Sequence, residues 1–201
     1  MRLNPVVLRS LLILVVSAAI VAVAALTDLP ERGGAGSPPM VAPAGHASEV
    51  RIADEAGFIA TLIPHHQEAV DSASSLLAVG ERVEARALAE EIVEAQRAEI
   101  TRLEAWLAEY YPGTRPDADY RPMMRDLGSL GAAEAEVTFV EGMIMHHEMA
   151  VAMAEAYLAL DAPRRPQVEA LARDVVATQS EEIERMQAYL DAWGVHNPGG
   201  H

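Results

Sequence analysis

Apolar residues recur every three or four positions in four long stretches of this chain, which is the spacing of one face of an α-helix. The pattern predicts helices at about residues 48–79, 82–110, 134–160 and 165–193. Gly80 and residues 161–163 supply short turns inside two helical hairpins, and residues 111–131 connect the hairpins. Each hairpin is too small to hold a core alone. We therefore expect their apolar stripes to pack together in an all-α, antiparallel four-helix bundle.

One short segment occurs twice along the chain. The residues "IPHHQEAV" at 63–70 return as "IMHHEMAV" at 144–151, and His65 matches His146 at a shift of 81 residues. The chain contains seven histidines, so four of them are used as two adjacent pairs in matching contexts. The second hairpin is therefore a copy of the first.

A second match supports this duplication. The residues "AQRAEITRLEAWL" at 95–107 correspond to "TQSEEIERMQAYL" at 178–190, at a shift of 83 residues. Repeat one then spans residues 48–112 and repeat two spans residues 134–194. Two packed copies of one hairpin predict a bundle with internal pseudo-twofold symmetry.

The paired histidines fall on the inward face of their helices when successive residues are placed about 100° apart. In the third predicted helix both histidines share that face with Met143 and Met153, and small alanines there leave room between the helices. In the first predicted helix Leu62 and Ser72 take the places of the two methionines. The candidate metal ligands are His65, His66, His146, His147, Met143 and Met153.

The second and fourth predicted helices each carry a glutamine and a glutamate within the apolar stripe. Burying a carboxylate is costly unless it is paired or binds a metal ion. We expect these side chains to lie behind the imidazoles and to orient them through hydrogen bonds. They are Gln96, Glu99, Gln179 and Glu182.

Pro64 precedes the first histidine pair, where the other repeat has Met145. A proline inside a helix costs about 3 kcal/mol and frees the carbonyl one turn earlier, here that of Ala60. Either the helix runs through Pro64 with this carbonyl free, or it breaks there. Both alternatives bend the chain beside the histidines.

Several ions fit a site of histidine and methionine. A single buried histidine is usually a hydrogen-bonded core residue, and a methionine on a bundle stripe is usually packing. The recurrence of both pairs favours a metal site instead. Imidazole and thioether ligands suit copper, especially Cu(I), and by extension Ag(I); zinc, nickel, iron and manganese stay open. The Glu-x-x-His spacing of di-iron bundles is absent at the histidine pairs.

Four further methionines are weaker candidates for metal ligands. Met145 and Met149 fall toward the other side of the third predicted helix, and Met123 and Met124 lie in the connection between the hairpins. They are either outer, transient ligands or simply packing and surface residues.

Charge and cysteine content narrow the function classes. The chain has 201 residues, a net charge of −15 and no cysteine. The acidic balance argues against nucleic acid or an anionic membrane surface as a partner, and it attracts cations. Without cysteine no disulfide, zinc–thiolate or iron–sulfur site can form, and methionine is the only soft ligand.

The N-terminal residues have the pattern of an export signal. Arg2 and Arg9 precede an uncharged run at residues 10–26, and residues 22–24 resemble an A-x-A cleavage site. The run also reaches the short limit of a membrane-spanning helix, so an uncleaved anchor stays open. Both alternatives place the rest of the chain outside the cytoplasm, at the cell surface, in a periplasm or outside the cell.

The sequence predicts that the chain is divided into three segments. Residues 27–47 are rich in glycine, proline, alanine and serine, which is typical of a flexible linker. We expect a signal peptide or transmembrane anchor at residues 1–26, the linker at residues 27–47 and the bundle at residues 48–201.

Two segments of the chain resemble the family called domain of unknown function 305. They are "FIATLIPHHQEAVDSA" at residues 58–73 and "FVEGMIMHHEMAVAMA" at residues 139–154, each followed by a Q-x-x-E-I segment, and the resemblance covers about residues 50–194. It implies a ferritin-like bundle of exported bacterial proteins, some of which look like periplasmic copper-binding proteins with methionine and histidine ligands. The family's M-x-x-H-H pattern is met by Met143 and the histidine pair of repeat two, whereas repeat one matches only at its histidines.

Three functions compete on the sequence alone. The first is an exported protein that captures copper, most suitably Cu(I), for tolerance or delivery. The second is a ferritin-like metal-dependent oxidase or peroxide-consuming enzyme, with Glu99 and Glu182 as ligands. The third is an interaction module whose histidines are structural. The sequence leaves self-association of the bundle open.

Overall fold

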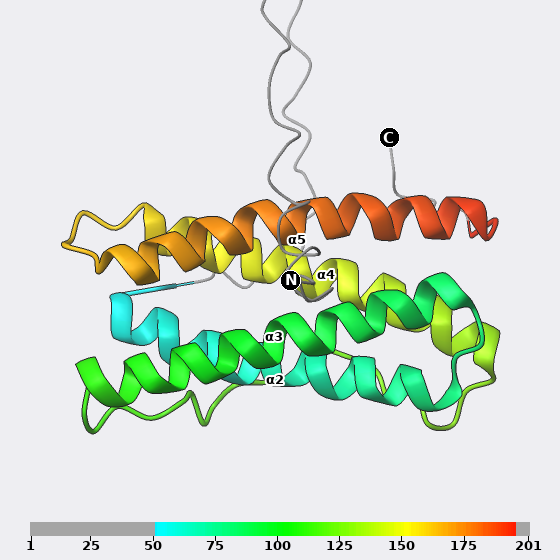
Figure 1. Ribbon diagram of the computed structural model, residues 1–201, viewed down its shortest axis with the longest axis horizontal. Helices are drawn as coiled ribbons and strands as arrows, with labels where there is room; N and C mark the ends of the chain where they lie inside the picture. Colours follow the sequence, from blue (N-terminus) through cyan, green and yellow to red (C-terminus); the bar gives the residue numbers. More distant parts are fainter. Residues whose placement is uncertain (1–50, 196–201) are drawn as a thin grey trace, which may run out of the picture. The chain divides into compact units, whose positions relative to one another are not determined.

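Four α-helices form the described part of the chain, residues 51–195, in this computed structural model (Figure 1). They are α2 (Glu55–Val79), α3 (Val83–Tyr110), α4 (Ala132–Leu158) and α5 (Pro166–Ala192). No strand occurs among these residues, which confirms the all-α prediction. The ends of α3, α4 and α5 lie within about two residues of the predicted ones.

The start of α2 differs from the prediction. The helix begins at Glu55 rather than near residue 48 because Asp54 caps it. Asp54 has an extended backbone, and its carboxylate accepts a hydrogen bond from the backbone N–H of Gly57 at 2.7 Å. A side-chain acceptor at this position satisfies one of the free N–H groups of the first turn, which fixes the helix start.

The two hairpins meet through their first helices. α2 packs against α3, α4 packs against α5, and α2 also packs against α4. The connecting segment, residues 111–131, returns along the bundle, so that α3 and α4 begin at the same end (Figure 1). Ferritin-like bundles have one long crossover of this kind.

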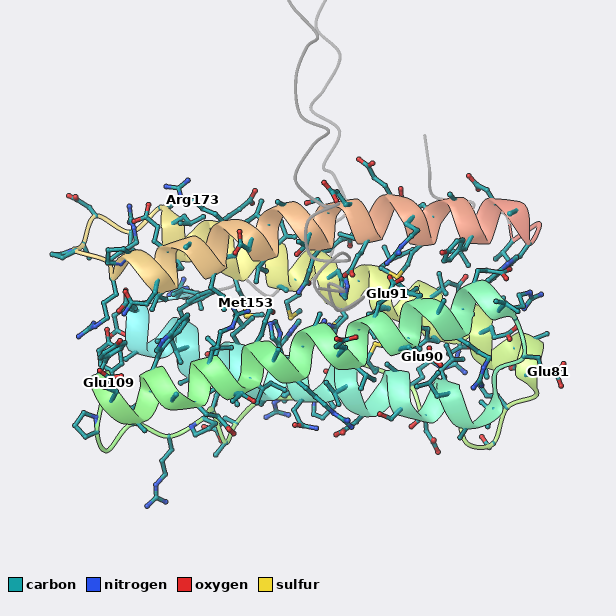
Figure 2. All side chains as sticks on the ribbon, in the orientation of Figure 1. Glu81, Glu90, Glu91, Glu109, Met153 and Arg173 are labelled. Atoms are coloured by element: carbon teal, nitrogen blue, oxygen red, sulfur yellow. The ribbon has the colours of Figure 1, made fainter. Side chains whose placement is uncertain are left out.

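The core of the bundle has two apolar clusters separated along the helices. Phe58 and Tyr157 stack in one cluster with ring centroids 4.5 Å apart, and Phe139 belongs to the other. Along α4 the membership changes between Met143 and Ala150, and the histidine pair of α4 lies between those residues. Figure 2 shows charged side chains on the outside of the helices. The histidines therefore lie between the two apolar clusters of the core.

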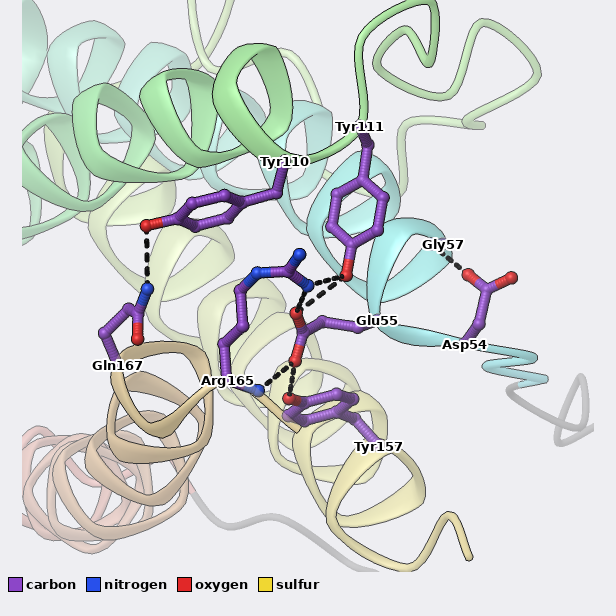
Figure 3. A network of polar contacts seen from close by, with 8 residues as sticks. All are labelled: Asp54, Glu55, Gly57, Tyr110, Tyr111, Tyr157, Arg165 and Gln167. Atoms are coloured by element: carbon purple, nitrogen blue, oxygen red, sulfur yellow. Dashed lines mark hydrogen bonds and ion pairs between the residues drawn. The ribbon is translucent and has the colours of Figure 1, made fainter. Parts of the chain in front are cut away.

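A buried carboxylate at the start of α2 binds the first hairpin to the second (Figure 3). Glu55 accepts hydrogen bonds from the Tyr157 hydroxyl at 2.6 Å and from the Tyr111 hydroxyl at 2.7 Å. It also accepts from the backbone N–H and the guanidinium of Arg165, each at 2.8 Å. The same guanidinium lies 4.3 Å from the ring centroid of Tyr110. These contacts join the start of α2 and the ends of α3 and α4 to the start of α5.

The other end of the bundle repeats this arrangement. Glu136 of α4 accepts a hydrogen bond from the backbone N–H of Arg82 at 2.6 Å and is paired with the Arg82 guanidinium. That guanidinium lies 4.5 Å from the ring centroid of Trp193. Glu136 follows Glu55 by 81 residues and Arg82 precedes Arg165 by 83, the two shifts of the sequence repeat. The predicted pseudo-twofold symmetry is therefore present in the contacts as well as in the helices.

Pro64 lies inside α2 without ending it, so the alternative of a broken helix is wrong. Because proline has no backbone N–H, the Ala60 carbonyl lacks its helical donor. The backbone N–H of Asp117, in the connecting segment, donates to this carbonyl at 2.9 Å. Pro64 thus leaves α2 with a free acceptor that holds the connecting segment against it.

No helix within residues 51–195 combines the length and the apolar character needed to cross a bilayer. The predicted signal or anchor at residues 1–26 and the linker at residues 27–47 lie outside the described residues. Both stay predictions.

Candidate metal centre

Four histidine side chains form one layer between the two apolar clusters. All four have no exposed surface, and α2 and α4 contribute two each. The rings of His65 and His146 lie against each other, with centroids 3.7 Å apart and planes inclined by 33°. His66 and His147 lie on either side of this pair, with ring centroids 6.1 Å from His65 and 6.2 Å from His146, respectively. We call these four side chains the histidine layer.

Most of the nitrogens in the histidine layer have no hydrogen-bond partner within the described residues. Both ring nitrogens of His65 and of His146 are unpartnered, as is Nδ1 of His66 and of His147. A buried polar atom left without a partner costs about 1–3 kcal/mol. Six such atoms in one layer therefore need a compensating role, and binding a cation is the one for which imidazole nitrogens are suited.

Two glutamates fix the orientation of the outer histidines. Glu99 of α3 lies 2.7 Å from Nε2 of His66, and Glu182 of α5 lies 2.8 Å from Nε2 of His147. An ionised carboxylate can only accept a hydrogen bond, so the proton of each neutral imidazole is on Nε2. Nδ1 then carries the free lone pair, which is the form of histidine that binds metals.

These hydrogen bonds belong to longer chains that reach the surface. The guanidinium of Arg102 lies 3.6 Å from Glu99, and that of Arg185 lies 3.7 Å from Glu182. Both chains have the same order, histidine, glutamate and arginine, at the shifts of the sequence repeat. In each chain, one carboxylate oxygen contacts the histidine and the other contacts the arginine.

The central pair has an acidic neighbour, Glu68. The carboxylate of Glu68 in α2 lies 3.6 Å from Nε2 of His146, a contact longer than a hydrogen bond. Glu68 also accepts hydrogen bonds from the Tyr120 hydroxyl and from the backbone N–H groups of Met123 and Met124, the latter two at 2.6 Å. Burial raises the pKa of Glu68, but its contacts with His146, Tyr120 and Met124 outweigh this and lower the pKa to about 2.

Burial favours the neutral form of three of the four histidines in the layer. Removal from water lowers the pKa of His65 well below 6.5, and the neighbouring imidazoles lower it further. Burial also lowers the pKa of His146 and His147, although their contacts with Glu68 and Glu182 act in the opposite direction. Neutral imidazoles keep their lone pairs, so these three side chains are in the state that accepts a cation.

The two predicted methionine ligands lie on opposite sides of the histidine layer. Met143 is fully buried in one apolar cluster, and Met153 is 2% exposed in the other, where Figure 2 shows it between the helices. Gln96 and Gln179 are also buried, and neither amide oxygen has a hydrogen-bond partner among residues 51–195. The structure thus shows no contact of the predicted kind between these amides and the imidazoles.

Over residues 51–195, no three histidine, aspartate and glutamate side chains are arranged to hold a metal ion by themselves. The residues still suit a soft ion, because unpartnered imidazole nitrogens and buried thioethers occur in the same part of the core. The structure brings the four histidines and two glutamates together. The ligand roles of these histidines and of the two methionines stay a prediction.

Glu68 and Tyr120 are the neighbours of the site that the sequence did not predict. The ring of Tyr120 lies edge-on to that of His65, with centroids 6.0 Å apart. Repeat two has Met149 where repeat one has Glu68, so a comparison of the repeats does not identify Glu68 as a candidate site residue. The sequence signal for Glu68 was only that an acidic residue follows His65 by three positions.

Solved structures similar to this chain include metal-bound ones. A DUF305 fragment from Deinococcus radiodurans is 34% identical, with a TM-score of 0.61, over 70% of this chain and 97% of that one. CopM in its Cu(I)-bound form is 29% identical, with a TM-score of 0.62 and the same two coverages. CopM has also been solved with Ag and with Cu(II) bound.

A third similar structure is a DUF305 protein from Streptomyces coelicolor, described as a presumed secreted protein. It is 26% identical, with a TM-score of 0.63, over 74% of this chain and 98% of that one. No curated protein matches this chain.

The family model for the domain of unknown function DUF305 matches residues 40–107 and, in a second match, residues 55–190. The second match begins at the first residue of α2 and ends within α5, so it includes most of both repeats. This chain therefore belongs to the DUF305 family.

Proposed function

We propose that this protein captures a soft metal ion, Cu(I) first of all, in the histidine layer. The observation that carries the proposal is the close pair of His65 and His146, whose four ring nitrogens are buried without a hydrogen-bond partner among residues 51–195. A structure keeps such atoms in its core at a cost in stability. A cation that accepts their lone pairs removes that cost.

The imidazoles of the histidine layer and the thioethers on either side of it favour copper among the possible ions. Imidazole with thioether is a set that binds Cu(I) and, by similar chemistry, Ag(I). Met143 and Met153 are two of the buried thioethers in the core. CopM, which is 29–30% identical to this chain, has been solved with Cu(I), Cu(II) and Ag bound, and this similarity also supports copper.

The competing function, a ferritin-like metal-dependent oxidase, has less support. Such enzymes bind iron or manganese largely through carboxylates. Here Glu99 and Glu182 are hydrogen-bonded to His66 and His147 and face arginines on their other side. Their contacts suit the orientation of imidazoles better than direct binding of two hard ions.

Capture outside the cytoplasm fits the rest of the chain. The predicted export signal at residues 10–26 would carry the bundle out of the cytoplasm, and the Streptomyces coelicolor relative is described as presumed secreted. Methionine and histidine without cysteine form a ligand set that is not lost to disulfide formation in an oxidising compartment. The protein then binds copper there for tolerance or delivery.

The test is competition for Cu(I) against a coloured chelator such as bicinchoninate, under anaerobic conditions, with a protein of residues 48–201. We expect the double variant His65→Asn, His146→Asn to bind Cu(I) about 100-fold more weakly than the parent, because both central ligands are removed. The matched control is His196→Asn, His201→Asn, which changes two histidines that follow α5 in the sequence and should bind like the parent. Equal Cu(I) affinity of parent and His65/His146 variant would refute the proposal.

A further inference from the structure

A surface groove of about 420 Å³ lies between α2 and the connecting segment. Pro64 and Glu68 line it from α2, and Tyr120 and Met124 line it from the connecting segment. Asp71 is also on the α2 side, and Arg125 and Asp126 are on the other. The groove is open to solvent, whereas the histidine layer is not, so the two are separate spaces.

The groove and the histidine layer share a wall. Glu68 lines the groove, and its carboxylate also lies 3.6 Å from Nε2 of His146. Tyr120 lines the groove as well, and its ring lies edge-on to His65. Glu68 and Tyr120 therefore line the groove and also contact the central histidine pair.

Met124 places a thioether in this groove, next to α4. A Cβ atom built on Gly142 would lie 3.2 Å from both Sδ and Cε of Met124, so the methionine end rests against the bare glycine. Gly142 precedes His146 by four residues, which is about one turn along the same face of α4. Repeat one has Thr61 at the matching position, so this arrangement occurs in one repeat only.

The charges around the groove suit a cation. Glu68, Asp71 and Asp126 are acidic, and Arg125 is the basic residue among the groove-lining side chains. The chain as a whole carries a net charge of −15. A cation is therefore drawn toward a groove that holds a soft ligand, Met124, beside a carboxylate.

We propose that the Met124 thioether and the Glu68 carboxylate form a loading site, where a soft monovalent cation first binds before it passes to His65 and His146. This inference rests on the proposed function, because it supplies the route to the site proposed there. The transfer is an exchange of ligands and involves no change in oxidation state. Tyr120 must give up its hydrogen bond to Glu68 for the cation to pass, since that bond engages the oxygen nearest His146.

The first test detects the loading site in the absence of the central pair, His65 and His146. Protein of residues 48–201 with His65→Asn and His146→Asn is labelled with ¹³C at the methionine methyl groups and titrated with Ag(I), a diamagnetic probe. Met124→Leu in the same background identifies the Met124 resonance. We expect that resonance to shift on addition of Ag(I), while that of Met143 does not. An unmoved Met124 resonance would overturn the loading site, whatever the parent protein binds.

The second test separates the rate of uptake from the affinity. Stopped-flow transfer of Cu(I) from a chelator to Met124→Leu should be about tenfold slower than to the parent, with the same final occupancy, because the histidines still set the equilibrium. Met145→Leu is the matched control: Met145 is 53% exposed on α4 and is not among the groove-lining residues, so uptake should be unchanged.

A third variant tests the same site through its glycine. Gly142→Ala displaces the end of Met124 and should also slow uptake. Parent-like rates in both Met124→Leu and Gly142→Ala would overturn the loading site but leave capture by the histidine layer standing. If the parent itself takes up no Cu(I), the proposed function fails and the loading site fails with it. The two failures are therefore distinguishable.

Discussion

The imidazole rings of His65 and His146 face each other across the interface between the two repeats, 3.7 Å apart at their centroids. Each ring is fully buried, and neither has a hydrogen-bond partner for its nitrogens within the described residues. His66 and His147, one residue further on, are each hydrogen-bonded to a glutamate. Adjacent histidines of one pair thus occupy different environments, and they should respond differently to substitution.

Replacing His65 with leucine should stabilise the metal-free protein. The substitution removes two unpartnered buried nitrogens and keeps an apolar side chain of similar bulk, so we expect the free energy of unfolding to rise by about 1–2 kcal/mol. Replacing His66 with leucine should do the opposite, lowering it by about 1 kcal/mol or more, because Glu99 then loses its donor. Urea unfolding in the presence of a chelator measures both changes. A loss of stability in His65→Leu equal to that in His66→Leu would contradict this difference.

The metal-free protein should lose stability as the pH falls from 7 to 5. Burial lowers the pKa of His65, His146 and His147 below the unfolded value of 6.5, so the unfolded chain takes up protons first. Their contribution to the free energy of unfolding is fully present above about pH 6.5. Below that pH it decreases by about 1.4 kcal/mol per pH unit for each histidine still neutral in the folded state. Urea unfolding at several pH values measures the slope.

Glu68 titrates in another range and serves as an internal reference. Glu68 has its pKa lowered from 4.5 to about 2, so its contribution is retained until the pH falls below 4.5. Leucine at His65 alone should therefore flatten the profile between pH 7 and 5 and leave the contribution of Glu68 below pH 4.5 in place, because its contacts with His146 and Tyr120 remain. An equally steep profile between pH 7 and 5 would show that other groups control it.

The helices, the repeat and the meeting of the histidine pairs could be predicted because each depends on local periodicity or on self-comparison. A 3.6-residue period fixes which face of a helix is apolar, and a duplicated hairpin must pack with near-twofold symmetry. His65 and His146 occupy equivalent positions near that axis, so their proximity follows from the symmetry. Glu99 and Glu182 were likewise predicted to orient imidazoles, and hydrogen bonds to His66 and His147 are present.

Contacts that break the symmetry or involve the connecting segment could not be predicted. Glu68 has no counterpart in repeat two, and its partners Tyr120 and Met124 lie in an irregular segment whose path no periodicity determines. Glu55 and Glu136 did match in the repeat, but an acidic residue at a helix start is ordinarily explained by the helix dipole. Nothing in the local sequence shows that each lies against the opposite hairpin.

The two end clusters around Glu55 and Glu136 should contribute independently to stability. Each carboxylate is almost fully buried and accepts several hydrogen bonds, so Glu55→Ala and Glu136→Ala should each cost about 3 kcal/mol. The 25-residue α2 separates them by roughly 37 Å, and the double variant should equal the sum of the singles within about 0.5 kcal/mol. Glu169→Ala, which removes an exposed pair with Arg173, is the control and should have a much smaller effect. Urea unfolding measures all four, and strong non-additivity would show that the ends are coupled.

Replacing Pro64 with alanine should stabilise α2 and loosen the connecting segment. Alanine restores a backbone N–H that can donate to the Ala60 carbonyl, and it removes a helix-interior proline, so we expect a gain of about 1–3 kcal/mol in the free energy of unfolding. The same N–H competes with that of Asp117, which now donates to this carbonyl at 2.9 Å. Amide hydrogen exchange should therefore speed up at Asp117 while it slows along α2. If the proline instead fits α2 so well that its removal lowers stability, or if exchange at Asp117 does not change, then the Ala60 carbonyl is not what holds the connecting segment against the helix.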